Sequence, residues 1–277
     1  MNTIKLPSGQ TIPALGMGTW RMGENHQHRQ QEVAALRRGL ELGVKLIDTA
    51  EMYGEGGAEE VVAEAVKGRR PNVFLVSKVY PHNASKEGVI AACNRSLKRL
   101  NTDYLDLYLL HWRGTTPLSE TLAAFETLKQ AGKIENYGVS NFDIDDMKEV
   151  TYLSKAKSIA VNQVLYNLTR RGIELDLLPW CQERNIPIMA YSPIEQGRLM
   201  GHKLLKQIAK QKGASEAQVA IAWLLHQENV IVIPKASKIT HVEQNYAACD
   251  IRLSQEDIAK LEMAFPQPDR PIPLQIL

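Results

Sequence analysis

The sequence predicts a single domain over residues 1–277 with the α/β fold of a (β/α)8 TIM barrel. The length of 277 residues suits one closed barrel, since barrels of this kind run near about 250 residues. Short apolar, β-branched runs alternate along the chain with amphipathic stretches of helical period. Such alternation predicts a parallel sheet, and eight strands is the number that closes this barrel. An open, doubly wound sheet is the alternative that the pattern leaves.

The predicted strands are eight runs bounded by polar or turn-forming residues. They are Ala14–Gly18, Lys45–Thr49, Val73–Ser77, Leu105–His111, Glu135–Ser140, Ala160–Val164, Ile188–Tyr191 and Val230–Pro234. Their spacing leaves room between neighbours for the crossover helix that a parallel connection requires.

The predicted helices lie between these strands. Val33, Leu36 and Leu40 repeat at helical spacing, and similar spacing recurs over residues 90–100 and 118–128. Ser215 and Gln218 form a capping-box pattern ahead of the apolar run Val219–Leu225. Gly43 and Gly132 each follow a helical pattern, where a left-handed residue ends a helix.

Two segments lie outside the repeat. Ile4–Leu6 and Gln10–Ile12 flank Pro-Ser-Gly and predict an N-terminal β-hairpin, which could plug the bottom of the barrel. Ser254–Phe265 predicts an extra C-terminal helix, and the proline-containing tail after it, Pro266–Leu277, is expected to be irregular.

Composition excludes several classes of protein. The chain is 44% hydrophobic and 23% charged, which is ordinary for a folded domain and not for a disordered chain or collagen. Its net charge of +2 does not indicate a nucleic-acid or membrane-surface binder. The three scattered cysteines argue against a disulfide scaffold and a structural zinc site. With no secretory signal or long apolar run visible, we expect a soluble cytoplasmic enzyme.

The usual nucleotide loops are missing. Gly16-x-Gly18 continues to Gly23, which is the wrong spacing for GxGxxG, and Gly54-x-Gly56-Gly57 lacks the later glycine. No GxxxxGK[ST] motif is present. A nucleotide would therefore bind this chain without a glycine-rich phosphate loop.

Polar side chains follow three neighbouring predicted strands. Asp48 lies at the end of the second, Lys78 follows the third and His111 ends the fourth, while Tyr53 lies in the loop after Asp48. In this barrel the carboxyl ends of the strands form one mouth, which carries the active site. Asp48, Tyr53 and His111 each have a structural explanation alone, as a cap, a loop tyrosine and a core histidine. Lys78 is less ordinary, because lysine is rarely buried without a partner. Together they would be costly to bury without a function.

The chemistry of this set is proton donation. A tyrosine has a pKa of about 10 and is a poor acid near neutrality. We expect the Lys78 ammonium to lower the pKa of Tyr53, and Asp48 to keep Lys78 charged. Tyr53 would then protonate a carbonyl oxygen that His111 orients, provided that a hydride donor is present. The remaining histidines show no spacing of metal ligands, so no metal is expected.

The chain resembles the aldo-keto reductase family over essentially its whole length. The motifs that carry the resemblance are Gly43–Gly54, Leu75–Val79, Asp106–Trp112, Gly138–Phe142 and Ile233–Ser237. The resemblance implies a (β/α)8 barrel that uses NADP(H), with Asp48, Tyr53, Lys78 and His111 as the catalytic tetrad and Tyr53 as the acid. It also suggests small aldehydes such as methylglyoxal as substrates, as in bacterial members of this type.

The resemblance also implies binding residues. The nicotinamide carboxamide would meet Ser140, Asn141 and Gln163, and the ring would stack on Tyr191. The pyrophosphate would meet Ser192, Ile194 and Gly197. The adenosine 2′-phosphate would meet Lys235, Ser237 and His241, and adenine would meet Gln244 and Asn245. Substrate would meet Trp20, Tyr80, His111 and Trp112.

Two departures from the family pattern have consequences. His241 stands where arginine is common and Ala236 where serine is frequent, which weakens the expected preference for NADPH. The short C-terminal segment suggests an open site.

Two other functions remain open at this stage. A Schiff-base lyase or aldolase on the same barrel would use Lys78 or Lys235 as its amine. A non-catalytic, cofactor-binding sensor would need only the fold. We expect a monomer whose partner is a small carbonyl compound, without nucleic acid or membrane.

Overall fold

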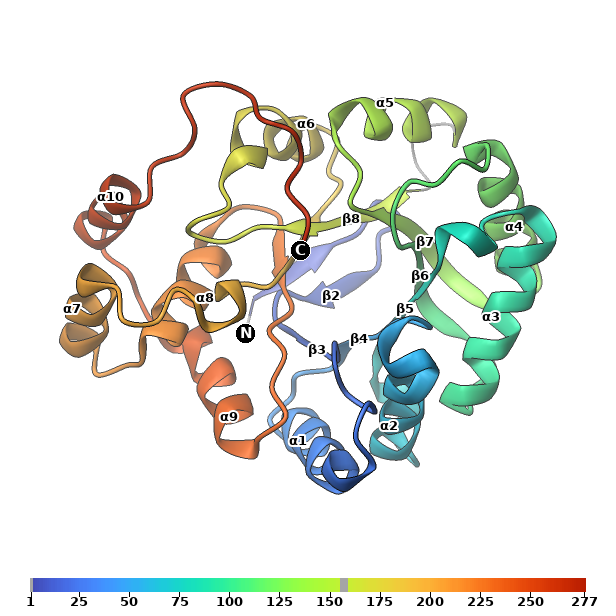
Figure 1. Ribbon diagram of the computed structural model, residues 1–277, viewed down its shortest axis with the longest axis horizontal. Coiled ribbons are helices and arrows are strands. Elements are labelled where there is room, and N and C mark those ends of the chain that lie inside the picture. The colour runs from blue at the N-terminus through green and yellow to red at the C-terminus, as the bar shows by residue number, and fades with distance from the viewer. Residues whose placement is uncertain (1, 155–158) are drawn as a thin grey trace.

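The chain folds into a parallel barrel surrounded by helices, as the sequence predicts (Figure 1). The structure is a computed structural model that describes residues 2–154 and 159–277. Its eight-stranded sheet runs in chain order: β3 (Gly16–Gly18), β4 (Leu46–Asp48), β5 (Phe74–Val79), β6 (Leu105–Leu110), β7 (Ile134–Ser140), β8 (Ile159–Leu165), β9 (Ile188–Tyr191) and β10 (Val230–Val232).

The barrel closes between its first and last strands. Single parallel bridges join Leu15 to Val232 and Gly18 to Lys235. These bridges confirm the closed barrel and exclude the open, doubly wound alternative.

The helices form the outer layer around the strands (Figure 1). They are α1 (Arg29–Glu41), α2 (Gly57–Val66), α3 (Lys86–Leu100), α4 (Leu118–Gln130), α5 (Ile144–Leu153), α6 (Leu177–Glu183), α7 (Lys203–Lys212), α8 (Glu216–His226), α9 (Ile239–Ala247) and α10 (Gln255–Ala264). Both predicted helix-ending glycines are left-handed, with φ of 92° at Gly43 and 70° at Gly132.

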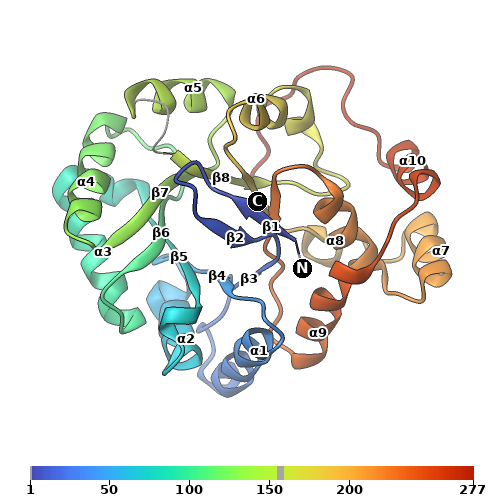
Figure 2. The same ribbon diagram turned by 180° about the vertical axis from the view of Figure 1, so that it is seen from behind.

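The predicted hairpin and extra helix are both present. Strands β1 (Thr3–Lys5) and β2 (Thr11–Pro13) pair antiparallel and cross the end of the barrel seen in Figure 2. Leu6 and Ile12 are buried with the inward-facing strand residues, so the hairpin closes this end. Helix α10 follows its N-cap Ser254, and residues 266–277 contain no regular element.

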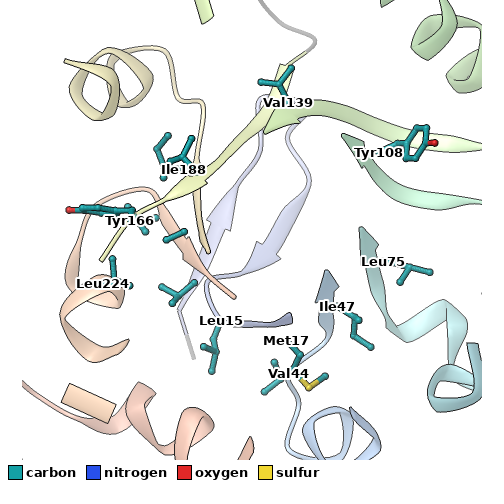
Figure 3. Packing of buried hydrophobic residues seen from close by; sticks show 14 of the residues in the cluster. Leu15, Met17, Val44, Ile47, Leu75, Tyr108, Val139, Tyr166, Ile188 and Leu224 are labelled. Carbon is teal, nitrogen blue, oxygen red and sulfur yellow. The ribbon is translucent and has the colours of Figure 1, made fainter. Parts of the chain in front are cut away.

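Strand alternation divides the apolar side chains into two cores. The larger core lies between the strands and the helices, and Figure 3 shows Ile47, Leu75 and Tyr108 among its members. The smaller core fills the barrel, with Leu46, Val76 and Leu109 among its members. Successive strand residues point to opposite faces. A side chain two residues after an inner-core residue on the same strand therefore also points into the barrel, nearer its mouth.

Candidate active site

Asp48, Lys78 and His111 continue the inward-facing rows of three adjacent strands. Leu46 precedes Asp48 by two residues, Val76 precedes Lys78, and Leu109 precedes His111, and all three apolar side chains belong to the inner core. Strand β5 runs to Val79, two residues beyond the predicted end at Ser77, so Lys78 is a strand residue. Alternation along the strands thus brings these three polar groups to one place.

Tyr53 reaches the same place from η2 (Tyr53–Gly56), the turn after β4. Glycines allow this turn to pack against the loop after β3. A Cβ on Gly54 would lie 2.9 Å from the Met22 carbonyl oxygen, and one on Gly57 would lie 2.7 Å from that of Gly23. The glycine-rich stretch here positions Tyr53, which explains why its spacing does not fit a phosphate loop.

Lys78 is the centre of the cluster. Its side chain is fully buried, and its Nζ lies 2.8 Å from both carboxylate oxygens of Asp48. The same ammonium donates to the Thr49 carbonyl oxygen at 2.9 Å and to the Tyr53 hydroxyl at 3.2 Å. These contacts satisfy the buried charge and fix the distance between the ammonium and the phenol.

The titration of Tyr53 differs from the sequence-based expectation. Burial raises the pKa of Tyr53 well above its usual value of 10.0, and the Asp48 carboxylate raises it further. Burial also lowers the pKa of Lys78, against the opposing effect of Asp48. The expected lowering by Lys78 was wrong, because burial of the phenol raises its pKa and the Asp48 carboxylate adds to the increase. Tyr53 is therefore a neutral phenol that holds its proton at neutral pH.

His111 is neutral as well. Burial, with the nearby Lys78 charge, lowers the pKa of His111 from 6.5 to about 2. Its ring lies edge-on to Tyr53, with 5.7 Å between the ring centroids. A neutral imidazole carries one N–H, which can donate to a carbonyl oxygen beside the phenol.

A second group of polar side chains adjoins the first. The Gln163 amide nitrogen donates to Asp48 Oδ1 at 2.8 Å, which links the two groups. The Ser140 hydroxyl donates to the Gln163 carbonyl oxygen, and the Tyr191 hydroxyl donates to Asn141 Oδ1 at 3.0 Å. Burial raises the pKa of Tyr191 to about 12, so its ring is neutral too. These amides and hydroxyls surround one side of the cavity.

Both groups face a cavity of about 740 Å³ at the carboxyl ends of the strands. Most of the residues predicted to act in catalysis or to contact substrate or cofactor line it: Trp20, Asp48, Tyr53, His111, Trp112, Ser140, Asn141, Gln163, Tyr191, Ser192, Ile194, Gly197 and Lys235. Lys78 lies beneath them through its contact with Tyr53.

Some predicted binding residues lie outside this lining. Ser237, His241, Gln244 and Asn245 do not line the cavity, although Lys235 Nζ lies 3.5 Å from the Ser237 hydroxyl. Tyr80 is also outside the lining, and its ring packs edge-on against Trp112 at 5.8 Å between centroids.

The structure adds lining residues that sequence reasoning missed. Arg21 follows Trp20 and stacks on its ring at 4.3 Å, and Met52 precedes Tyr53. Ile276 and Leu277 also line the cavity, so the C-terminal segment does not leave the site as open as expected. Adjacency to a predicted residue could have indicated Arg21 and Met52, whereas no pattern in the tail indicates where its last residues lie.

A family comparison agrees with this geometry. The model of the Aldo/keto reductase family matches residues 14–264. The chain belongs to the aldo/keto reductase family.

Relatives of this aldo-keto reductase cover nearly its whole length. It is 53% identical over 270 residues to the methylglyoxal reductase YeaE of Escherichia coli, covering 96% of this chain and 95% of that protein. It is 35% identical to the glyoxal reductase of Bacillus subtilis, covering 97% and 96%. An aldo-keto reductase from Klebsiella pneumoniae, crystallised in complex with NADPH, superposes with a TM-score of 0.97 at 50% identity and covers 100% of this chain and 99% of that one.

The described residues contain neither a metal-binding cluster nor a membrane-spanning helix. Across residues 2–154 and 159–277, no three histidine, cysteine or acidic residues gather closely enough to hold a metal ion. Within the same described ranges, no helix has the length and apolar character needed to cross a bilayer.

Proposed function

We propose that this aldo-keto reductase reduces small aldehydes and ketones, 2-oxoaldehydes such as methylglyoxal among them, to alcohols with NADPH, and that Tyr53 gives the proton. The observation that carries the proposal is the contact of Lys78 Nζ with the Tyr53 hydroxyl at 3.2 Å, beside His111 in the cavity. This arrangement supports Tyr53 as the acid that protonates a carbonyl oxygen.

The residues around the cavity fit a nicotinamide dinucleotide. Asn141 and Gln163 offer amide groups of the kind that bind a carboxamide, next to the flat ring of Tyr191. Ser192, Ile194 and Gly197 line the cavity and are the candidates for the pyrophosphate, and Lys235 offers a cation for the 2′-phosphate. Ser237, His241, Gln244 and Asn245 remain the candidates for the adenosine end. NADPH, when bound, supplies the hydride.

The chain's own residues manage the proton. Tyr53 holds its proton at neutral pH, where even an ordinary tyrosine is protonated, and burial raises its pKa further, so the acid is present in its active form. The alkoxide that forms during carbonyl reduction is more basic than a phenolate, so proton transfer from Tyr53 is favourable. Lys78 then stabilises the phenolate, and Asp48 holds the ammonium in place. Neutral His111 donates a hydrogen bond that orients the carbonyl.

The walls of the cavity support a small, partly apolar substrate. Trp20, Met52 and Trp112 line it near the tetrad, and Ile276 and Leu277 line it from the tail. Tyr80 supports Trp112 from behind by its edge-on contact. The relative YeaE is named as a methylglyoxal reductase, which supports the same class of substrate here.

The Schiff-base alternative with Lys78 as its amine has weaker support. Lys78 has no exposed surface, and its ammonium donates to Asp48, Thr49 and Tyr53. A Schiff base needs a free amine within reach of the carbonyl. The buried contacts of Lys78 favour a fixed charge over a nucleophile.

The experiment is a panel of aldehydes, ketones and sugars assayed at fixed NADPH by the loss of its absorbance. We expect turnover with methylglyoxal and other small aldehydes. Tyr53→Phe keeps the ring and removes the proton, so we expect kcat to fall by roughly 10²-fold to 10⁴-fold, the range for general acid catalysis, with little change in NADPH affinity. Near-normal turnover in this variant would remove Tyr53 from the mechanism. Borohydride trapping of substrate on a lysine would instead support the lyase.

A further inference from the structure

Glu195 is a buried carboxylate in the loop that borders the cavity. Only 4% of its surface is exposed, and it begins η6 (Glu195–Gly197) after β9. Its neighbours Ile194 and Gln196 line the cavity, but Glu195 itself does not. Its side chain therefore serves something other than direct contact with a ligand.

Three residues donate hydrogen bonds to this carboxylate. Glu195 Oε1 accepts from Arg170 Nη2 at 2.7 Å and from Arg170 Nε at 3.0 Å. The same oxygen accepts from Arg198 at 3.0 Å, and Oε2 accepts from the Asn167 amide at 2.8 Å. Burial works against the charge, yet hydrogen bonds from Arg170, Asn167 and Arg198 hold the pKa of Glu195 below its usual range. We call Asn167, Arg170, Glu195 and Arg198 the Glu195 network.

The turn after β8 that contacts Glu195 is itself held by hydrogen bonds. The Arg170 amide donates to the Asn167 carbonyl oxygen at 2.9 Å, and Asn167 Oδ1 accepts from both the amide and the hydroxyl of Thr169 at 2.9 Å. The Asn167 side chain also donates to the Ser192 carbonyl oxygen at 2.9 Å. This turn is thus a rigid support that contacts the cavity loop at both Ser192 and Glu195.

The cavity loop has a backbone that needs such support. Ser192, Glu195 and Gln196 have φ of 49°, 49° and 54°, in the left-handed region that L side chains rarely adopt. Residues in this region persist only where the surrounding structure over-determines them. The contacts of Glu195 with Arg170 and Asn167, which lie outside the loop, hold the loop in this conformation.

We infer that Glu195 is a positioning residue, which holds the loop 192–197 in the shape that receives the dinucleotide pyrophosphate. The inference rests on the proposed function. Glu195 acts through Ser192, Ile194 and Gly197, whereas its carboxylate stays in the Glu195 network. A loop held in this shape before binding loses less conformational freedom on binding, which increases affinity.

This role predicts a specific signature. The pyrophosphate is common to NADPH and NADH, so loss of Glu195 weakens the binding of both cofactors by the same factor. Loss of Lys235 would weaken NADPH alone. The tetrad is untouched, so kcat at saturating cofactor stays near the wild-type value. Binding requires the loop to be held in its left-handed shape, and the cost of holding even one such residue corresponds to roughly 10-fold in affinity.

The test measures Kd for NADPH and NADH by fluorescence titration of the wild-type protein and E195A, with kcat at saturating cofactor. The matched control is E174A. Glu174 accepts from Arg171 at 2.7 and 2.8 Å in a buried ion pair of the neighbouring turn, and none of these contacts involves the loop 192–197. We expect Kd to rise at least about 10-fold for both cofactors in E195A and to stay unchanged in E174A. Equal Kd increases in the two variants would overturn the inference, because loss of any buried ion pair would then have the same effect.

Two further variants keep the test decisive if E195A does not fold. E195Q keeps the oxygen that faces Arg170 but loses the charge and the acceptor for Asn167. We therefore expect Kd to rise equally for NADPH and NADH, but by less than in E195A. R170A combined with E195Q should weaken binding by less than the product of the single effects, because the two residues act as one unit. Wild-type affinity in E195Q and R170A would overturn the inference. If the wild-type protein itself bound neither cofactor, the proposed function would fail instead.

Discussion

At the scale of single residues, the site depends on which face of a strand each side chain occupies. Asp48, Lys78 and His111 all extend inward-facing rows whose earlier members are Leu46, Val76 and Leu109. Each polar residue is therefore buried at the mouth and not between the barrel and the helices. Burial in turn sets the chemistry, because it keeps both Tyr53 and His111 neutral.

The pH dependence of carbonyl reduction follows from these two residues. His111 has a pKa of about 2, so it stays neutral and does not titrate near its usual 6.5. In the proposed mechanism Tyr53 must be protonated to act, and its pKa is raised above its usual 10.0, so its own titration lies beyond the usual tyrosine range. We expect kcat, measured at saturating NADPH and aldehyde, to be flat through neutrality. A step in kcat centred near pH 6.5 would contradict a neutral His111.

Lys235 carries the prediction for cofactor choice. A charge-assisted hydrogen bond contributes about 1.5–3 kcal/mol, or roughly 10-fold to 150-fold in affinity. Lys235→Met should weaken NADPH by about this factor and leave NADH nearly unchanged, because NADH lacks the 2′-phosphate. Fluorescence titration with both cofactors measures this, and Lys238→Met, which changes an exposed lysine next to α9, is the control. Equal losses for the two cofactors would exclude Lys235 from the phosphate site.

At the scale of elements, local signals mark helix ends better than they mark helix faces. Helix α8 is buried on most of its surface, from Val219 to Leu224, so amphipathic period says little about it. Its start is nevertheless clear, because the predicted capping box of Ser215 and Gln218 is present with both reciprocal hydrogen bonds. The same device begins α10, where Ser254 and Asp257 form the box.

The capping box of α8 can be tested directly. The Ser215 hydroxyl accepts from the backbone N–H of Gln218, and Ser215→Ala leaves that donor without its partner. We expect the free energy of unfolding to fall by about 0.5–2 kcal/mol, with NADPH binding unchanged. Denaturant unfolding measures the loss against Ser8→Ala, which lies in the exposed hairpin turn. A loss no larger than that of the control would mean that the cap contributes nothing.

At the scale of the whole molecule, closure of the barrel brings distant residues together. Gly18 in β3 and Lys235 beyond β10 are bridged, and the Gly18 amide donates to the Pro234 carbonyl oxygen at 3.1 Å. A Cβ on Gly18 would lie 2.9 Å from the Ile233 carbonyl oxygen, which is backbone and cannot turn away. The closing seam therefore requires a glycine, and it also carries Lys235 to the cavity.

Gly18→Ala tests the seam. We expect a lower melting temperature, corresponding to about 1–3 kcal/mol of overpacking, together with weaker NADPH binding because Lys235 is displaced. Gly16→Ala on the same strand is the comparison, since its added methyl meets the side chains of Leu46 and Ile233 and lies away from the bridge to Lys235. Wild-type stability and NADPH binding in Gly18→Ala would contradict a seam limited by backbone contact.

Much of this molecule follows from sequence patterns that act locally. Apolar period, helix caps and turn glycines predict the eight strands, the hairpin that covers one end of the barrel and the extra helix. Each of these depends on residues close together in the chain. Strand alternation likewise places Asp48, Lys78 and His111 at one mouth. The motifs around these residues also indicate the family.

Tertiary structure decided what depends on residues far apart in the chain. The direction of the Tyr53 pKa shift reflects burial together with the nearby Asp48 charge, which only the packed site sets. The contact of Gln163 with Asp48 and that of Arg170 with Glu195 join segments that no local pattern connects. Ile276 and Leu277 reach the cavity along an irregular tail, whose path is determined by what it packs against. These features arise from long-range packing and electrostatics, which short-range sequence patterns do not encode.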